Sequence, residues 1–360
     1  MKNKIICVIM AVFIGGFSAL AYFAPKDEYS LWERRQLAKF PELSIDTIFN
    51  ASFMNSFEKY ATDNFSLRDD FRRIRAIWDK IAFLKLDTND LYLKDGYIVK
   101  SEYPLKHQSL DNALSKFAFI REKYLDENNK VYFSLIPDKN YFAAGEEYLS
   151  FDYNEMAEYM ANGMDYASYI DIFELLQLED YYKTDTHWRQ ENLLDVAEKL
   201  MDEMGAEYSG EFTENTLDKD FYGVYYGQAA LPVPPEEIKY LTSDVIDGCT
   251  VFDYENNKET DIYDMEKAES NDPYEMYLSG PISLMEINNP AQDNGRHLVI
   301  FRDSFGSSIA PLLVEGYSKI TLVDIRYISS HYIGSFVDFE GADVLFMYSS
   351  LVLNNTEMFK

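Results

Sequence analysis

The stretch HLVIFRDSFG, residues 297–306, decides the fold. Its mainly apolar first half, residues 297–301, is typical of a buried strand. The residues that follow, GSSIA at 306–310, predict the start of a helix. A strand that turns sharply into a helix belongs to an α/β sheet, and it projects Ser304 beyond the sheet edge. The amide groups of the next helix then lie near the serine hydroxyl, where negative charge develops during acyl transfer.

The motif DTHW, residues 185–188, offers the base that such a serine needs. A serine hydroxyl is a weak nucleophile until a base takes its proton, and His187 is the best-placed histidine for that role. Asp185 reaches the same imidazole if the loop is extended, and would fix its tautomer. Each motif alone is more often structural, because Asp-x-His is common and Asp-Ser often caps a helix. Their combination favours a catalytic centre built from Ser304, His187 and Asp185.

The other histidines offer one rival base. His331 lies near the end of another predicted strand, whereas His107 lies in a polar loop and His297 begins a strand. The chain has no Cys/His cluster spaced for zinc, no glycine-rich phosphate loop and no dinucleotide fingerprint. We therefore expect neither a metal ion nor an organic cofactor in the reaction.

Helix and strand patterns alternate on both sides of the catalytic motifs. We predict helices at residues 46–86, 110–125 and 191–204, and strands at 130–136, 167–173, 297–301, 320–325 and 344–348. From residue 110 onward this alternation predicts an α/β fold with a central, mostly parallel sheet. Residues 207–295 break the pattern, being rich in Tyr, Asp, Glu and Pro. We interpret them as an irregular, β-rich insertion placed to roof the site.

The N-terminus indicates export. Lys2 and Lys4 precede a mainly apolar segment, residues 5–24, which is long enough to span a bilayer. The lysines place the short N-terminus in the cytoplasm and the remainder outside. The sequence ALA at residues 19–21 matches a signal-peptidase site, so both an uncleaved anchor and a cleaved signal peptide are consistent with the sequence. We predict an anchor or signal peptide at 1–24, a linker and helical segment at 25–90, and a catalytic domain at 91–360.

Composition excludes some partners. With 47% hydrophobic and 16% aromatic residues among 360, the chain has enough apolar side chains for a substantial core. Its 62 acidic and 33 basic residues give a formal charge of −29. This acidity would repel the phosphates of a nucleic acid, so we expect no nucleic-acid partner. The two cysteines, Cys7 and Cys249, are not expected to pair, because Cys7 lies in the N-terminal apolar segment.

Several separated motifs carry a family resemblance. An Asp-x-His-Trp motif followed by a strand ending in Asp-Ser resembles the alginate O-acetyltransferase proteins of the SGNH-hydrolase-like superfamily and, still more, the bacterial DHHW proteins. WERRQLAKFP at residues 32–41 resembles the opening signature of these proteins. DNFSLRD at 63–69 resembles their second signature, and YLKDGY at 92–97 resembles the hairpin that follows. These motifs occur in the family's order from about residue 30 onward.

The resemblance implies a fold, an activity and partners. It implies an SGNH-hydrolase-like three-layer domain in which the serine, histidine and aspartate named above form the triad. It also implies acetylation of a cell-surface or secreted polysaccharide, with a membrane-bound O-acyltransferase supplying the acyl group across the membrane. Thr186 replaces the first histidine of the family motif. Asp185 and His187, the triad residues of that motif, are both retained. At Pro281 the family's oxyanion-hole asparagine is missing, which leaves the Gly280 amide as a donor.

Three further residues are candidates for the substrate site. Lys139 follows a predicted strand and Arg326 follows another, at the sheet edge where open α/β sheets bind their ligands. A solvated loop position is the alternative for Lys139, and a salt bridge to Asp324 or Asp303 is the alternative for Arg326. Trp188 offers either a sugar-stacking face or core packing.

The sequence thus predicts an extracytoplasmic O-acetyltransferase that forms an acyl-serine at Ser304 and passes the acyl group to a sugar hydroxyl. A carbohydrate acetylesterase, in which water accepts the acyl group, uses the same residues and is one alternative. A glycan-binding or scaffold protein with a decayed site is another, motivated by Pro281.

Overall fold

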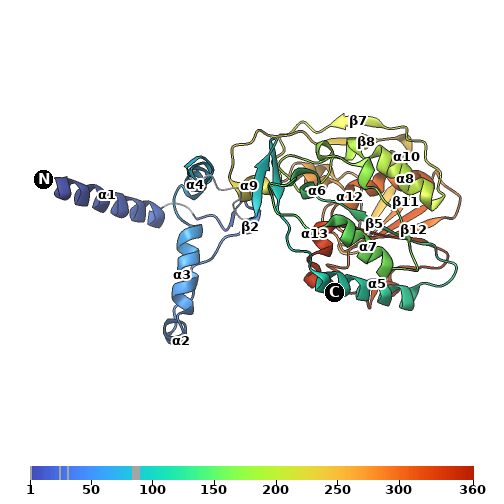
Figure 1. The fold of residues 1–360 in the computed structure, drawn as a ribbon, viewed down its shortest axis with the longest axis horizontal. Coiled ribbons are helices and arrows are strands. Elements are labelled where there is room, and N and C mark those ends of the chain that lie inside the picture. Colours follow the sequence, from blue (N-terminus) through green and yellow to red (C-terminus); the bar gives the residue numbers. More distant parts are fainter. Residues whose placement is uncertain (1, 24–25, 31, 83–89) are drawn as a thin grey trace. The chain divides into compact units, whose positions relative to one another are not determined.

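The fold is that of a computed structural model of the chain, which describes residues 2–23, 26–30, 32–82 and 90–360. These residues form two compact units (Figure 1). Unit 1 comprises Met1–Asn89 and Val224–Val233, and unit 2 comprises Asp90–Gly223 and Pro234–Lys360. Residues 24 and 25 of the predicted anchor and linker, and residues 83–86 of the predicted helical stretch, lie outside the described residues.

Unit 2 is built around one sheet. Among its described residues, eight strands lie in the order β10-β9-β11-β13-β12-β14-β5-β6. The strands are β5 (Val131–Ile136), β6 (Ser168–Tyr169), β9 (Thr250–Asp253), β10 (Lys258–Thr260), β11 (Leu284–Asn288), β12 (His297–Arg302), β13 (Lys319–Val323) and β14 (Asp343–Ser349). Pairs from β13 to β6 are parallel, and pairs from β13 to β10 are antiparallel. The predicted α/β class with a mostly parallel central sheet is confirmed.

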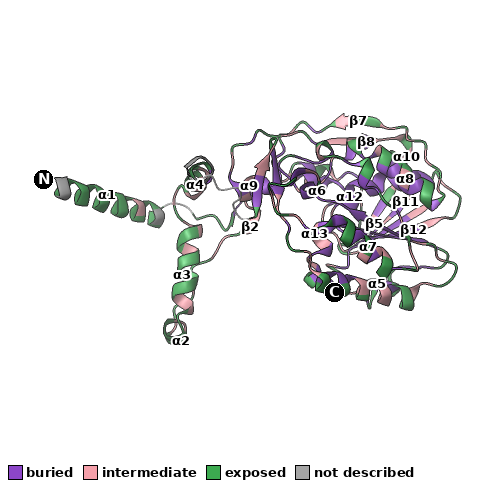
Figure 2. Cartoon of the chain, viewed as in Figure 1, coloured by how far each residue is buried: buried purple, intermediate pink, exposed green. Residues whose placement is uncertain are grey.

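Both faces of this sheet are buried. Along β12, Leu298 and Ile300 enter one core cluster and Val299 and Phe301 enter the other, because successive side chains of a strand point to opposite faces. The first cluster includes side chains of α8 (Leu194–Met204) and η5 (Ala310–Gly316), and the second includes those of α5 (His107–Tyr124) and α7 (Tyr153–Gly163). Figure 2 shows α8 buried along one side and exposed along the other. Two-sided burial explains why the strand is a continuous apolar run.

Residues 207–295, predicted to roof the site, contribute to the sheet itself. They contain β9, β10 and β11, which extend the parallel strands by antiparallel pairing. Val251 and Ile287 from these strands enter the first core cluster, and this burial sets the register of strands only three to five residues long. The same stretch also contains β7 (Thr213–Thr216), β8 (Lys239–Thr242), α10 (Asp244–Gly248), α11 (Met265–Ala268) and η4 (Pro273–Met276).

The predicted hairpin at the start of unit 2 is formed by β3 (Leu91–Lys94) and β4 (Tyr97–Lys100). Its two turn residues, Asp95 and Gly96, have φ of 49° and 87°, as a tight hairpin turn requires. The other elements of unit 2 are α6 (Lys139–Ala143), η1 (Phe173–Leu175), η2 (Leu178–Asp180), η3 (Gln190–Asn192), α12 (Gly306–Ile309), η6 (Ile333–Ser335), α13 (Ser350–Leu353) and η7 (Thr356–Met358).

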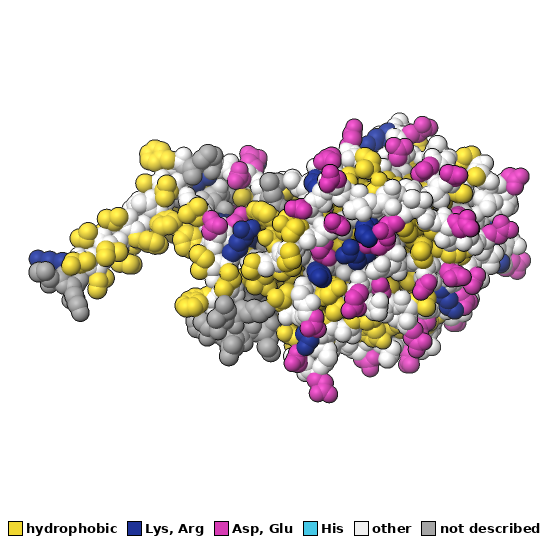
Figure 3. All heavy atoms as spheres, turned by 90° about the horizontal axis from the view of Figure 1, so that it is seen from above, with side chains coloured by type: hydrophobic (Ala, Val, Ile, Leu, Met, Phe, Trp, Pro, Cys, Tyr) yellow, Lys and Arg dark blue, Asp and Glu magenta, His cyan; other side chains and the backbone are white. Residues whose placement is uncertain are grey.

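Unit 1 contains α1 (Lys2–Phe23), β1 (Tyr29–Ser30), β2 (Arg35–Gln36), α2 (Ile45–Phe49), α3 (Ser52–Asp63), α4 (Arg68–Ala82) and α9 (Val224–Ala229). The predicted helical stretch is divided at Ala51 and Leu67, whose positive φ values of 61° interrupt a right-handed helix. Many hydrophobic side chains are exposed along α1 (Figure 3). In the part of the chain that the structure describes, no helix is both long enough and apolar enough to cross a membrane.

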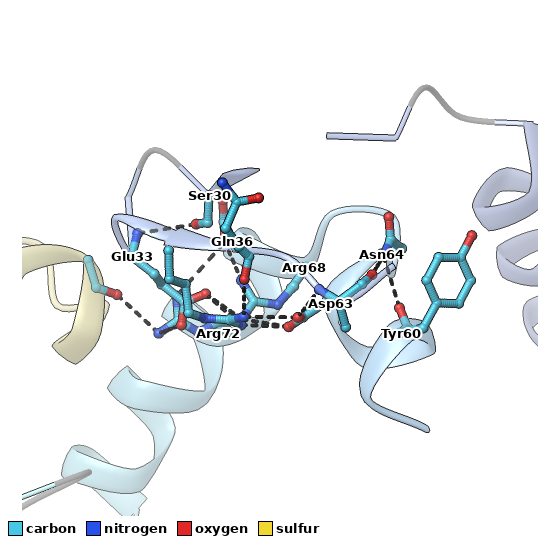
Figure 4. A network of polar contacts seen from close by, with 12 residues as sticks. Ser30, Glu33, Gln36, Tyr60, Asp63, Asn64, Arg68 and Arg72 are labelled. Atoms are coloured by element: carbon cyan, nitrogen blue, oxygen red, sulfur yellow. Dashed lines mark hydrogen bonds and ion pairs between the residues drawn. The ribbon is translucent and has the colours of Figure 1, made fainter. Parts of the chain in front are cut away.

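A charged network joins the two signature segments of unit 1 (Figure 4). Arg35 of the first segment pairs with Asp63 of the second at 2.5 Å, and Arg68 of the second pairs with Glu33 of the first at 2.5 Å. Arg72 also contacts Glu33, at 3.1 Å. The hydrogen bond from Arg35 lowers the pKa of Asp63 to about 2. The two segments are therefore ion-pair partners of one another.

Candidate active site

Ser304 lies in the turn between β12 and α12, at the carboxyl edge of the parallel strands. Asp303 anchors this turn. Its Oδ1 accepts a hydrogen bond from the Phe305 amide at 3.0 Å, and its Oδ2 accepts from the Ser349 amide and hydroxyl at 2.8 and 2.7 Å. Because Ser349 ends the neighbouring strand β14, the turn is tied to the sheet, and Ser304 itself stays partly exposed.

Ser304, His187 and Asp185 form a chain of hydrogen bonds. The His187 Nε2 lies 2.7 Å from the Ser304 Oγ, and the His187 Nδ1 lies 2.6 Å from the Asp185 Oδ1. The same carboxylate oxygen accepts the His187 amide at 3.1 Å. An ionised carboxylate only accepts hydrogen bonds, so Nδ1 is assigned the proton and Nε2 faces the serine as an acceptor. Two motifs 117 residues apart in the sequence therefore meet in the fold.

Asp185 is held firmly in its loop. Its side chain is only 1% exposed. The Glu236 carboxylate accepts the amides of Lys183 and Thr184 at 2.8 and 2.9 Å, immediately before Asp185. The Gly223 amide donates to the Thr184 Oγ1 at 3.0 Å. The loop that carries the acid is thus braced by two segments from later in the chain.

Trp188 fastens the DTHW loop to the serine turn. Its Nε1 donates to the Ser308 Oγ at 2.8 Å and lies 3.2 Å from the Phe305 carbonyl oxygen. Gln190, two residues on, donates from its Nε2 to the Ser308 carbonyl at 2.7 Å. Because the Trp188 side chain is 0% exposed, it has no free face for a sugar. The sugar-stacking interpretation is wrong, and the core-packing alternative is confirmed.

Tyr274 lies against His187 and was not predicted from the sequence. It belongs to η4, and its ring is stacked on the His187 imidazole with centroids 4.0 Å apart and planes 8° apart. Its hydroxyl donates to the Ser308 Oγ at 2.9 Å. Burial raises the pKa of Tyr274 well above its ordinary value, so the phenol keeps its proton. The sequence offers no motif here, only a Pro-Tyr pair in an aromatic-rich stretch.

Lys139 is directed into the protein and not into solvent. Its side chain is 2% exposed, and its ammonium donates to the carbonyls of Ile98, Tyr182 and Lys183 at 2.5, 2.9 and 3.4 Å. Burial lowers the pKa of Lys139 to about 7, against the opposing effect of Asp185. The solvated-loop alternative is wrong. These contacts make Lys139 a brace between the β3–β4 hairpin and the segment that leads to Asp185.

The remaining substrate-site candidates have local partners. The Arg326 Nε and Nη2 donate to the Asp324 carboxylate at 2.9 and 2.6 Å, which confirms the salt-bridge alternative for this arginine. The Gly280 amide, predicted as an oxyanion donor, points to the Tyr277 carbonyl at 3.3 Å. Gly280 has a φ of +84°, a backbone conformation that glycine adopts most readily.

His331, the rival base, lies elsewhere in unit 2. It is exposed, and its ring centroid is 4.4 Å from that of Phe119 on α5. The hydrogen-bonding position beside Ser304 is occupied by His187. Among the residues that the structure describes, no group of His, Cys, Asp and Glu side chains is arranged to hold a metal ion.

This arrangement can activate a hydroxyl group for attack on a carbonyl. The His187 Nε2 at 2.7 Å is within reach of the Ser304 proton, and a buried carboxylate at 2.6 Å holds the ring and stabilises the imidazolium that proton transfer would form. The fold and this geometry place a serine, a histidine and an aspartate in hydrogen-bonding sequence at the carboxyl edge of an α/β sheet, an arrangement that suits acyl transfer.

Comparison with known proteins finds a match to one sequence family. The sequence model of the DHHW protein family matches residues 149–323, a stretch that contains Asp185, His187 and Ser304. The resemblance to DHHW proteins predicted from the sequence motifs is confirmed. No curated protein sequence matches the chain.

Solved structures share the fold. A DHHW family protein from Eubacterium siraeum has 19% sequence identity and a TM-score of 0.60, covering 76% of this chain and 94% of its own. PatB1 from Bacillus cereus, solved with a sulfonyl adduct, has 20% identity and a TM-score of 0.58, covering 75% of this chain and 97% of its own. At these identities the likeness shows a common fold.

Proposed function

We propose that this protein is an extracytoplasmic O-acetyltransferase that modifies a cell-surface or secreted polysaccharide through an acyl-serine intermediate. The observation that carries the proposal is the 2.7 Å contact between the His187 Nε2 and the Ser304 Oγ, with Asp185 at 2.6 Å behind the histidine. The resemblance to alginate O-acetyltransferase and DHHW proteins supports acetyl as the transferred group and a glycan as the acceptor.

The reaction has two half-reactions. In the first, the Ser304 Oγ attacks the carbonyl carbon of an acyl donor while the His187 Nε2 takes the hydroxyl proton. The bond from that carbon to the donor's leaving oxygen or sulfur then breaks, and the leaving group takes the proton from His187. In the second, a sugar hydroxyl attacks the acyl-serine ester and gives its proton to His187. The Ser304 Oγ leaves and recovers this proton, while Asp185 stabilises the imidazolium in both halves.

The proposed location rests on the N-terminal sequence. Lys2 and Lys4, followed by the mainly apolar residues 5–24, support export with the catalytic unit outside the cytoplasm. Activated acyl groups are made in the cytoplasm, so the donor has to cross the membrane. A membrane-bound O-acyltransferase, which the family resemblance implies, is the partner that supplies it, and an enzyme anchored at the membrane surface suits that relay.

The geometry favours an enzyme over a decayed scaffold. In a decayed site we would not expect a hydroxyl, an imidazole and a buried carboxylate to remain hydrogen-bonded in this order. The acetylesterase alternative uses the same acyl-serine, with water in place of the sugar hydroxyl. What separates the two enzymes is the acceptor.

The test is to incubate the purified full chain with p-nitrophenyl acetate, with and without oligosaccharides from the bacterial cell envelope, and to detect acetylated sugar by mass spectrometry. We expect acetyl-oligosaccharide to form, and to be lost in Ser304→Ala but kept in Ser150→Ala, which replaces a half-buried serine whose hydroxyl donates to the Phe151 carbonyl. Release of p-nitrophenol and acetate with no acetylated oligosaccharide, at a rate that added oligosaccharide does not change, would establish the esterase. Full activity of Ser304→Ala would overturn both enzyme assignments.

A further inference from the structure

We propose that Tyr274 is a positioning residue that holds the His187 imidazole by ring stacking and favours its charged form during proton transfer. The inference rests on the proposed function, since it concerns how the base of that site works. It starts from the parallel stack of the two rings, with centroids 4.0 Å apart and planes 8° apart.

The His187 ring is held by hydrogen bonds at both nitrogens and by ring contacts. Asp185 holds its Nδ1 and Ser304 meets its Nε2. Tyr274 covers one face, and the Phe305 ring lies at 5.0 Å with a tilt of 56°. Hydrogen bonds at two ring nitrogens fix the imidazole in its plane but leave it free to tip about the line between them. The Tyr274 ring blocks that tipping, which keeps Nε2 aimed at the serine.

The stack acts differently on the two protonation states. The face of an aromatic ring carries negative partial charge, so it attracts a cation more strongly than a neutral ring. His187 becomes an imidazolium only after it takes the serine proton. Tyr274 therefore stabilises the state in which negative charge develops on the substrate, and an interaction made mainly in that state raises the rate.

Tyr274 is itself held by the catalytic machinery. Its hydroxyl and the Trp188 Nε1 both donate to the Ser308 Oγ, at 2.9 and 2.8 Å. That one hydroxyl on α12 therefore joins η4, the DTHW loop and the helix that follows Ser304. The phenol oxygen anchors the residue and the ring does the stacking, so the two contributions can be separated by substitution.

Other charged groups lie near the stacked rings of His187 and Tyr274, and a test must leave these groups unchanged. They are Asp185 on the same loop, Asp303 on the serine turn, Asp272 beside η4 and, next to Asp185, Lys139 on α6. Substitution at position 274 by neutral residues changes none of them. Any change in the pH dependence of the reaction then comes from the ring.

The experiment measures the rate constant of Ser304 modification by phenylmethylsulfonyl fluoride against pH, in the full chain. In this reaction the Ser304 Oγ bonds to sulfur, fluoride leaves, and the hydroxyl proton passes to His187. Variants are Tyr274→Phe, Tyr274→Leu and a series with mono-, di- and trifluorophenylalanine at position 274. Fluorination withdraws charge from the ring face and keeps the shape of phenylalanine, so the series stays informative if the leucine variant fails to fold.

We expect Tyr274→Phe to keep the wild-type pH profile, because the stack is retained. Tyr274→Leu should react about three- to thirtyfold more slowly, and the acidic limb of its profile should move to lower pH by about half to one unit. The fluorinated series should move the limb stepwise in the same direction. If the acidic limb of the pH profile stays at the same pH across the series, the inference is overturned. Labelling of wild-type Ser304 in that same experiment would still support the proposed function. Absence of wild-type labelling at Ser304 would overturn both.

Discussion

Gly223 packs directly against Asp185, so closely that a Cβ on the glycine would lie 2.3 Å from the Cβ of the aspartate and 2.4 Å from its Cα. Real atoms do not approach this closely, and backbone cannot yield as a flexible side chain does. The absence of a side chain at residue 223 is therefore what allows Asp185 to occupy its position. It also explains how a glycine far from the DTHW motif in sequence can matter to the site.

Gly223→Ala should displace Asp185 and with it the His187 ring. We expect acyl transfer to fall about 100-fold, because a shift of about 1 Å in a catalytic group costs roughly that factor. The measurement is kcat/KM for p-nitrophenyl acetate. Gly248→Ala is the matched control, since a Cβ there has no atom within 4 Å, and it should leave the rate unchanged. Equal rates in the two variants would show that the Asp185 loop tolerates displacement.

Trp188→Phe tests the fastening between the two catalytic motifs. The variant loses the Nε1 bond to the Ser308 Oγ and leaves a cavity in a fully buried position. We expect the free energy of unfolding to fall by about 2–4 kcal/mol and the acyl-transfer rate to fall at least tenfold.

The comparison for this prediction is Trp78→Phe. Trp78 is 62% exposed, so its substitution should change the free energy of unfolding by less than about 0.5 kcal/mol. Urea unfolding followed by circular dichroism measures both variants. A Trp188→Phe protein as stable as Trp78→Phe would mean that Ser308 and its neighbours repack around the smaller ring.

The contact between the DTHW motif and the Asp-Ser turn could be predicted from the sequence, because parallel strands bring their carboxyl ends to one edge of a sheet. The apolar run of β12 and the Asp-Ser turn after it place Ser304 at that edge, and the loop before α8 is the natural place for a base. The alternation of burial along β12, with Leu298 and Val299 in opposite clusters, follows from the strand period alone.

The rest of the site depends on contacts that no helical or strand periodicity in the sequence indicates. Tyr274 reaches His187 from a short 3-10 turn in a stretch without helical or strand periodicity, so neither period could indicate it. Lys139 follows a strand as a ligand residue would, yet its ammonium turns inward to three carbonyls. Residues 207–295 contain the strands that their β-rich interpretation predicts, but their place in the central sheet depends on the pairing of β11 with β13, a long-range contact that local composition does not reveal.

Asp63→Asn should loosen unit 1 in a pH-dependent way. The hydrogen bond from Arg35 lowers the pKa of Asp63 from 3.8 to about 2, so this carboxylate contributes stability above its ordinary pKa. That contribution is lost as the pH falls through about 2. We expect the backbone amides of residues 32–41 to exchange hydrogen faster in the variant at pH 5, and the difference to shrink toward pH 2.

Hydrogen exchange read by mass spectrometry, with both proteins at the same pH, isolates this effect from the intrinsic rate. The Ala38 amide, which donates to the Asp63 carboxylate at 2.9 Å, is the most direct reporter. If wild type and Asp63→Asn differ in exchange by the same amount at pH 5 and at pH 2, the loss of the carboxylate charge is not the cause. The side-chain amide of the variant would then fail to accept these hydrogen bonds for steric reasons.

Lys139→Met should change how stability depends on pH. Burial lowers the pKa of Lys139 to about 7 in the fold, whereas the unfolded chain keeps the ordinary 10.5. Between these values the unfolded state binds more protons at this side chain, so wild-type stability rises with pH there. The unfolding free energy of wild type minus that of the variant should increase from pH 7 to 10 by at most about 1.4 kcal/mol per pH unit, and should be flat below pH 6.

Urea unfolding of both proteins across pH 5 to 10 measures this difference, because every other titrating group is common to the two chains. A curve that is flat over the whole range would mean that the three carbonyl oxygens around the ammonium, at 2.5 to 3.4 Å, keep it charged in the fold despite its burial. The same experiment reports on the site, since two of those carbonyls belong to Tyr182 and Lys183, just before Asp185. If the ammonium braces that segment, Lys139→Met should also slow sulfonyl fluoride labelling of Ser304 at pH 6, where the wild-type side chain is charged.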